Sequence, residues 1–278
     1  MKLSLAIASK EAAESAFVVY RGIEESIEKA SKLGYHGVEL ALKRVDEVDR
    51  EKLGKWLKKW NMEVSAISTG QVFSDLGLYF THKDDNKRRE TIEVFKGLID
   101  LAADYGKIIN VGRARGFVDE TQTKEQAQSL FLETMRLLCD YAEPKGVTII
   151  IEPVNRYEIN FVNNLDQGYE LAELVGKRNI GLMPDVFHMN IEDDDIAQSL
   201  VRNGKYVKYI HFADSNRLSP GKGHLDFKMI LNALKTIGFD GWASVEILPE
   251  PDPDVAAACS AETLLPLIEE YSCNGGEK

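Results

Sequence analysis

The sequence predicts a single (β/α)₈ barrel domain over residues 1–278, and three observations carry this prediction. Short runs of β-branched and apolar residues alternate with longer segments of helical periodicity along the whole chain. No composition break, linker or low-complexity tract divides it. Several helical segments end at a glycine just before the next apolar run, where helices commonly terminate in a left-handed conformation.

The alternation gives eight predicted strands. They cover residues 2–8, 37–42, 63–68, 107–112, 147–154, 180–186, 207–214 and 242–247. The clearest predicted helices between them are 22–34, 49–60 and 87–106. The third of these has a buried face, because apolar residues recur in it at three- and four-residue spacing. The glycines expected to end helices are Gly34, Gly106, Gly146, Gly176 and Gly238.

A doubly wound open sheet is the alternative architecture. It would normally have fewer strands, and no G-x-G-x-x-G sequence follows the first one. The longest predicted loop, residues 70–86, follows the third strand and is rich in aromatic residues. In a barrel this loop would overhang the active face, so we predict that it forms a lid.

Charge and cysteine content narrow the function classes. Forty-five acidic against 34 basic residues give a net charge of -11, which opposes binding to nucleic acid or anionic membranes. The apolar run at the N-terminus is too short for a signal peptide, and no stretch approaches the ~20 residues of a membrane span. The cysteines, Cys139, Cys259 and Cys273, are few and unpatterned. We therefore expect a cytoplasmic protein.

Four polar side chains lie near the ends of the last four predicted strands, one to a strand. Glu152, Asp185, His211 and Glu246 each lie late in a strand, where barrel enzymes place catalytic groups. Each alone has an ordinary explanation, such as an ion pair, a helix cap or a hydrogen-bonded core histidine, but their matching depth favours a common site. Three carboxylates and one imidazole suit a divalent metal ion, Mn²⁺ foremost and Mg²⁺ or Co²⁺ as alternatives, better than structural zinc.

Further polar residues lie just beyond these ligands. Glu158, His188 and Arg217 follow Glu152, Asp185 and His211 by six, three and six residues. Each alone could be an ordinary loop residue. Together they would surround the metal with an acceptor, a switchable donor and a fixed cation, a mixture that a polyhydroxylated ligand needs. The sequence has neither a phosphate-binding P-loop nor a G-x-S-x-G elbow.

These segments make the chain recognisable. "IEPVNRYE", "PDVFHMN", "HFADSNR", "PGKGHLDF" and "SVEILP" resemble the xylose-isomerase-like sugar isomerase and epimerase barrels, within them most closely the ketose 3-epimerases that act on D-tagatose and D-allulose. "STGQ" and "GRARG" look closer still to the 5-keto-L-gluconate epimerase branch. The resemblance covers essentially the whole chain.

The resemblance implies a role for each residue. It makes Glu152, Asp185, His211 and Glu246 the metal ligands, with Glu152 and Glu246 also the acid–base pair, working through a cis-enediolate. Glu158, His188 and Arg217 would bind the O1 to O3 end of a small sugar or sugar acid. It also implies a homo-oligomer, a dimer or tetramer.

Other functions compete with a 3-epimerase. An aldose–ketose isomerase of the hydroxypyruvate-isomerase type would use the same metal and glutamates one carbon along. A subunit that cleaves C-glycosides with a partner protein also begins by removing an α-proton. An apurinic-site endonuclease shares the barrel, but it needs extra histidines where this chain has "STGQ" and "NVGR".

One further residue bears on substrate charge. Arg113 and Arg115 lie just past the fourth strand, and the epimerase-branch resemblance singles out Arg115. A keto-uronate would carry a carboxylate at the end away from the metal, and such a charge needs a partner when buried. We therefore expect Arg115 to bind that carboxylate.

Overall fold

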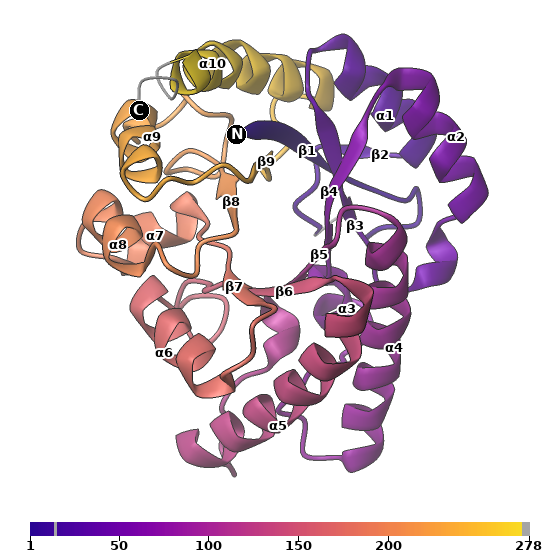
Figure 1. Ribbon diagram of the computed structural model, residues 1–278, viewed down its shortest axis with the longest axis vertical. Coiled ribbons are helices and arrows are strands. Elements are labelled where there is room, and N and C mark those ends of the chain that lie inside the picture. Colours follow the sequence, from indigo (N-terminus) through magenta and orange to yellow (C-terminus); the bar gives the residue numbers. More distant parts are fainter. Residues whose placement is uncertain (14–15, 274–278) are drawn as a thin grey trace.

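The protein is a ring of parallel strands surrounded by helices, as the computed structural model shows (Figure 1). The structure describes residues 1–13 and 16–273. The strands run in the order β7-β6-β5-β4-β3-β1-β9-β8. Two isolated bridges, Leu182 with Val207 and Asp185 with His211, join the two ends of this series. The predicted (β/α)₈ barrel is confirmed.

Every predicted barrel strand is present, although most are shorter than predicted. They are β1 (Lys2–Ala8), β3 (Gly37–Ala41), β4 (Glu63–Ser68), β5 (Ile108–Val111), β6 (Thr148–Ile151), β7 (Ile180–Leu182), β8 (Tyr209–Phe212) and β9 (Trp242–Val245). A two-residue strand, β2 (Tyr20–Arg21), pairs with the end of β1.

The helices lie on the outside of the ring (Figure 1). In the described residues they are α1 (Ile23–Lys32), α2 (Arg50–Trp60), α3 (Gly70–Ser74), α4 (Asp85–Asp104), α5 (Lys124–Ala142), α6 (Leu165–Val175), α7 (Val186–Glu192), α8 (Ile196–Asn203), α9 (Phe227–Thr236) and α10 (Pro253–Cys273). Three short 3₁₀ helices are η1 (Val45–Glu47), η2 (Arg113–Arg115) and η3 (Glu143–Lys145).

The predicted helix patterns match the packing. Phe95, Leu98 and Ile99 of α4 are fully buried against the barrel, as their spacing predicts. All five glycines expected to end helices have positive φ. At Gly106 the requirement is also steric, because a Cβ there would lie 2.9 Å from the carbonyl oxygen of Val64.

The segment 70–86 differs from the long loop that was predicted. Its first residues form α3, and Leu78 and Phe80 are fully buried. The Phe80 amide donates to the Ala114 carbonyl at 3.0 Å, which ties the segment to η2. Its aromatic residues therefore serve in part to pack it onto the barrel.

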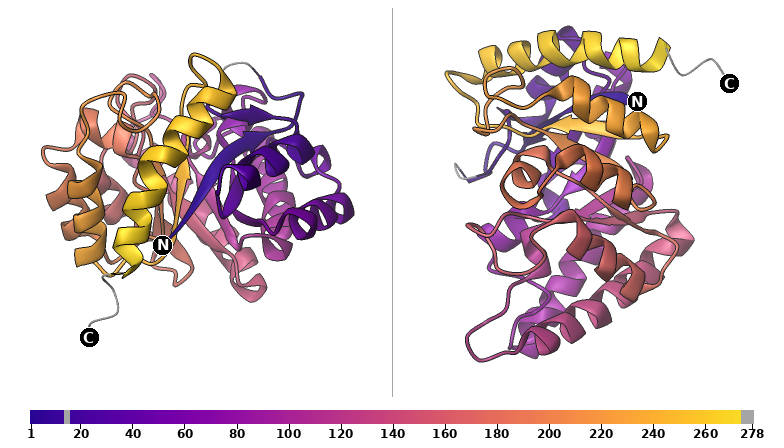
Figure 2. Two further views of the ribbon diagram at one scale, coloured as in Figure 1. Left: turned by 90° about the horizontal axis from the view of Figure 1, so that it is seen from above. Right: turned by 90° about the vertical axis from the view of Figure 1, so that its left-hand side faces the viewer.

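The C-terminal helix completes the outer layer. In Figures 1 and 2, α10 (yellow) lies beside β1. No helix in the described ranges is long and apolar enough to cross a membrane. Cys139 and Cys259 are free thiols, and the side chain of Cys273 lies outside the described part.

Candidate metal centre

Glu152, Asp185, His211 and Glu246 converge at the carboxyl ends of β6 to β9. Each offers one ligand atom, and these four atoms all lie within 4.8 Å of one another. Backbone hydrogen bonds between neighbouring strands position two of them. The amide of Glu152 donates to the Val111 carbonyl, and the amide of Glu246 donates to the Phe212 carbonyl. Four neighbouring strands thus bring the predicted residues together as the sequence indicated.

A buried carboxylate orients His211 from inside the barrel. Glu39 on β3 is fully buried, and its two oxygens lie 2.9 and 3.1 Å from Nε2 of His211. The Tyr209 hydroxyl donates to the same carboxylate at 2.9 Å. Burial opposes ionisation of Glu39, but the charge of His211 outweighs it and lowers the Glu39 pKa. Glu39 therefore fixes the proton of His211 on Nε2.

The other ring nitrogen of His211 faces the carboxylates. Nδ1 is buried without a hydrogen-bond partner. It lies 3.4 Å from an oxygen of Glu246, 3.6 Å from Glu152 and 3.7 Å from Asp185. Burial opposes ionisation of His211, but the charges of Glu39 and Glu246 outweigh it and raise the His211 pKa well above its usual value, so Nδ1 carries a proton in the metal-free site. A divalent cation would replace that proton and satisfy all four groups. The donor set of three oxygens and one imidazole nitrogen fits such an ion.

One carboxylate oxygen of Glu152 is fixed by a hydrogen bond, and the other faces His211 in the site. Its Oε2 accepts a hydrogen bond of 3.1 Å from Asn110, which the backbone amide of Thr69 orients in turn. Gly112 lies so close that a Cβ there would be 2.5 Å from Oε2. Burial, together with the charges of Glu246 and Asp185, raises the pKa of Glu152 to about 7.

Arg217 lies directly against two of the carboxylates. Its guanidinium donates to Asp185 and Glu246, and the rings of Phe17 and Phe187 flank it at 5.0 and 4.9 Å. Burial opposes ionisation of Asp185, but the Arg217 charge outweighs it and holds the Asp185 pKa well below its usual range. The other Asp185 oxygen caps α7 through the Phe187 amide at 2.9 Å.

His188 presents a donor to the same site. Asn155 Nδ2 lies 2.8 Å from His188 Nδ1, and Asn155 Oδ1 accepts from the Tyr157 amide, so Nδ2 is the donor. Burial lowers the pKa of His188 to about 4, so the ring is neutral near pH 7 and its proton lies on Nε2. That nitrogen lies 3.9 Å from Asp185. Glu158 accepts from Asn155 at 3.1 Å.

These residues line one pocket at the mouth of the barrel. Its lining includes Glu152, Glu158, His188, Arg217 and Glu246. Ala41 and segment 68–74, at the ends of β3 and β4, line the side of the pocket across the ring from β7 and β8, and segment 16–18 lines it beside Arg217. The segment predicted to be a lid therefore borders the pocket through α3.

The expectation for Arg115 has to be corrected. Its side chain is fully buried and does not line the pocket. The guanidinium donates to the carbonyls of Gly112, Glu152, Phe161 and Val162 at 2.7–2.9 Å. Burial lowers its pKa to about 9. Committed to four backbone oxygens, Arg115 has no free face for a substrate carboxylate; Arg113 is the arginine of this turn that lines the pocket.

A family model described as xylose isomerase-like TIM barrel matches residues 27–265. The chain belongs to this family. A probable ketose 3-epimerase of Synechocystis is 25% identical over 85% of this chain and 83% of the relative. An inosose isomerase of Bacillus velezensis is 28% identical over 81% and 83%. A D-psicose 3-epimerase from Clostridium cellulolyticum, solved with D-tagatose, superposes with a TM-score of 0.81 at 22% identity, covering 97% and 99% of the two chains.

The site of this xylose isomerase-like barrel contains residues that sequence reasoning missed. Glu39, Asn110 and Asn155 orient His211, Glu152 and His188 respectively. Glu39 had the same signal as Glu152, a lone acid in an apolar strand. Asn110, a polar residue in an otherwise apolar strand, had a similar signal, whereas Asn155 had none because asparagine is common in loops.

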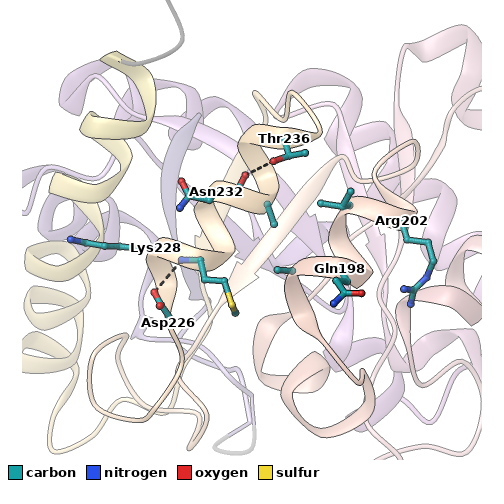
Figure 3. Close-up of a pocket in the computed structure, with 10 residues that line it drawn as sticks. Gln198, Arg202, Asp226, Lys228, Asn232 and Thr236 are labelled. Atoms are coloured by element: carbon teal, nitrogen blue, oxygen red, sulfur yellow. Dashed lines mark hydrogen bonds between the residues drawn. The ribbon is translucent and has the colours of Figure 1, made fainter.

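A second hollow lies on the outer face, between α8 and α9 (Figure 3). Its floor is largely apolar, with Ala197, Val201 and Met229. Arg202 and Lys228 point to opposite sides in Figure 3, and Arg202 pairs with Asp166 at 2.8 Å. The described residues that line this hollow include no histidine, and none of them belongs to the candidate metal centre.

Proposed function

We propose that the protein is a divalent-metal-dependent ketose 3-epimerase. The observation that carries the proposal is the placement of Glu152 and Glu246, whose carboxylate oxygens lie 3.6 and 3.4 Å from Nδ1 of His211. They come from β6 and β9, the two outer strands of the four that form the site. A pair that flanks a bound ketose on two sides is what inversion at carbon requires.

The reaction needs a proton to leave C3 on one face and another to arrive on the other. A divalent ion held by the four residues would polarise the ketone and stabilise the negative charge that develops on its oxygen. Either glutamate can remove the proton while its partner donates from the opposite side. In the metal-free site burial raises the pKa of Glu152 to about 7, and the charge of a bound cation would lower it, so that the carboxylate is ionised and able to accept the proton.

The remaining polar groups would bind and orient the sugar. The neutral His188 offers its Nε2 proton to a substrate oxygen, and Glu158 offers a carboxylate to a hydroxyl. Arg217, already in contact with two of the carboxylates, holds their oxygens in place through its rigid fork. The proposed reaction is supported by the names of several similar proteins, which are ketose 3-epimerases.

An isomerase that moves the ketone by one carbon is the second candidate. Inosose isomerases of three Bacillus species are 28–29% identical to this chain. Such an enzyme would use the same metal centre and the same proton abstraction. The two reactions differ only in where the second proton arrives.

The position of solvent hydrogen distinguishes the candidates. The purified protein is incubated in D₂O with Mn²⁺ or Mg²⁺ and a panel of ketoses, keto-uronates and inososes, and the metal is chelated before NMR. A 3-epimerase introduces deuterium at C3 of the epimer. Deuterium at C1, or a ketone shifted to the next carbon, would support the isomerase instead.

Variants of the two glutamates test the assignment of the acid–base pair. We expect Glu152→Gln and Glu246→Gln each to reduce turnover by at least about 10²-fold, because each removes a proton-transfer group as well as an anionic ligand. His211→Ala should mainly weaken metal binding. Near wild-type turnover of Glu152→Gln at saturating metal would show that Glu152 does not transfer the proton.

A further inference from the structure

The pocket wall opposite the metal centre differs in chemistry from the wall that carries the ligands. This wall consists of Ala41 and segment 68–74, and among the described residues it contributes no charged side chain to the pocket lining. A ketose bound to the carboxylate side through its carbonyl would extend towards this wall. The side chains of this wall would therefore contact the end of the substrate that does not react.

Gln71 is a polar side chain of this wall with one buried atom, Oε1, that has no hydrogen-bond partner. It lies on α3, is 3% exposed and lines the pocket. Its Nε2 donates to the Ala41 carbonyl at 3.0 Å. Because a carbonyl can only accept, this bond fixes which end of the amide is nitrogen. Oε1 is then the free end, and it is buried without a hydrogen-bond partner.

An unpartnered amide oxygen selects for hydrogen-bond donors. A substrate hydroxyl can donate to it, whereas an ionised carboxylate only accepts and would be repelled. Buried polar groups in folded proteins are normally satisfied, so an orphaned acceptor in a substrate pocket indicates a ligand that supplies the missing donor. Arg115, the residue expected to favour a carboxylate, is occupied by backbone carbonyls.

We propose that Gln71 Oε1 accepts a hydrogen bond from a hydroxyl at the non-reacting end of the substrate, so that the site prefers neutral polyhydroxylated ketoses to keto acids. This rests on the proposed function and assigns it a substrate class. The rival determinant is Arg113, which also lines the pocket and would favour a carboxylate. The Arg113 guanidinium already has an anionic partner, because its Nη1 lies 3.8 Å from Oε2 of Glu158.

The test uses the metal-loaded enzyme and four ligands: D-tagatose, its 5-deoxy and 6-deoxy analogues, and the keto acid with a carboxylate at C6. For each, kcat/KM for C3 exchange and Kd by calorimetry are measured in the wild type and in Gln71→Met. Gln122→Met is the matched control. Gln122 also donates through Nε2 to a carbonyl, that of Thr81, and also has an unpartnered buried Oε1, but it does not line the pocket.

We expect Gln71→Met to weaken D-tagatose binding and kcat/KM by about 2- to 13-fold, the range for one hydrogen bond. One deoxy analogue should show the same loss in the wild type and no further loss in the variant. Gln122→Met should leave all four ligands unaffected.

Equal losses on all four ligands in Gln71→Met, or tighter wild-type binding of the keto acid than of D-tagatose, would overturn the proposal. So would a wild-type enzyme that binds none of the hydroxylated ketoses. If the ketoses bind with the expected pattern but no C3 exchange occurs, the proposed function fails while the role of Gln71 stands. The two failures are thus distinguishable.

Discussion

At the scale of single residues, the geometry of the candidate site depends on groups that lie behind its four converging side chains. Glu39 reaches His211 across the inside of the barrel, since β3 and β8 are not neighbours in the ring. Its charge keeps a His211 proton on Nε2 and leaves Nδ1 for a cation. Partners of this kind commonly influence metal affinity nearly as strongly as the ligands do.

Replacing Glu39 with glutamine should therefore weaken metal binding by about 10- to 100-fold, because a neutral amide no longer provides the negative charge that makes the imidazole a stronger ligand. Metal affinity is measured by competition with a chelator. Tyr209→Phe is the control: it removes the hydroxyl that donates to Glu39 and leaves the bond between Glu39 and His211 in place. Equal affinity in Glu39→Gln and the wild type would exclude an orienting role.

Metal affinity should also depend on pH through Glu152. Its pKa is raised to about 7, so below that pH the metal-free site holds a proton that a cation must displace. Apparent affinity should fall by up to about tenfold for each pH unit below 7, per proton released. Calorimetry in two buffers of different ionisation enthalpy counts the protons. Constant affinity between pH 6 and 8 would contradict this.

At the scale of elements, Arg115 connects three segments that carry the site. Its bonds reach Gly112 after β5, Glu152 after β6, and Phe161 and Val162 in the following loop. Val162 has a φ of 63°, which is unfavourable for a β-branched residue. The bond from Arg115 to its carbonyl holds it there, at the end of the loop that carries Asn155 and Glu158.

Arg115→Lys should consequently destabilise the protein and lower kcat more than it raises KM. An ammonium cannot reach four carbonyls at once, and each buried carbonyl left unsatisfied costs about 1–3 kcal/mol. Urea denaturation gives the free energy of unfolding, and Arg113→Lys serves as the control. In Arg115→Ala, added methylguanidinium should restore part of kcat; a variant with wild-type kcat and stability would show that the bonds are dispensable.

The sequence predicted the elements well and their cross-barrel contacts poorly. Strands, helices and the four ligands follow from periodicity and from one polar residue per strand, which are local signals. Glu39 and Arg115 act through partners far away in the sequence, and only the closed ring determines which side chains meet. Arg115 was misassigned because its position after β5 does not reveal that its side chain turns inward to the backbone.

At the scale of the whole molecule, the site lies across one of the two weakly paired joins in the ring. In the described residues, the β7 and β8 segments are joined by two isolated bridges, one of them between Asp185 and His211 themselves. The other weak join, between β4 and β5, has the single pair Ile67 and Ile109 and lies away from the four converging side chains. An ion bound by residues from both sides would connect β7 with β8 across this join, and would connect both with β6 and β9.

Metal binding should therefore raise the thermal stability of the protein. At a free metal concentration of 100 times Kd, binding to the folded state contributes about 2.7 kcal/mol. For a chain of this size that corresponds to roughly 5–10 °C in Tm, at about 2–4 °C per kcal/mol. Calorimetric melts with metal and with chelator give the shift, and hydrogen exchange locates it. Slower exchange of the amides of β8 than of β3 would place the gain at the join. An unchanged Tm despite measurable metal binding would mean that unfolding leaves the site intact, and that the β7–β8 join does not limit the stability of the barrel.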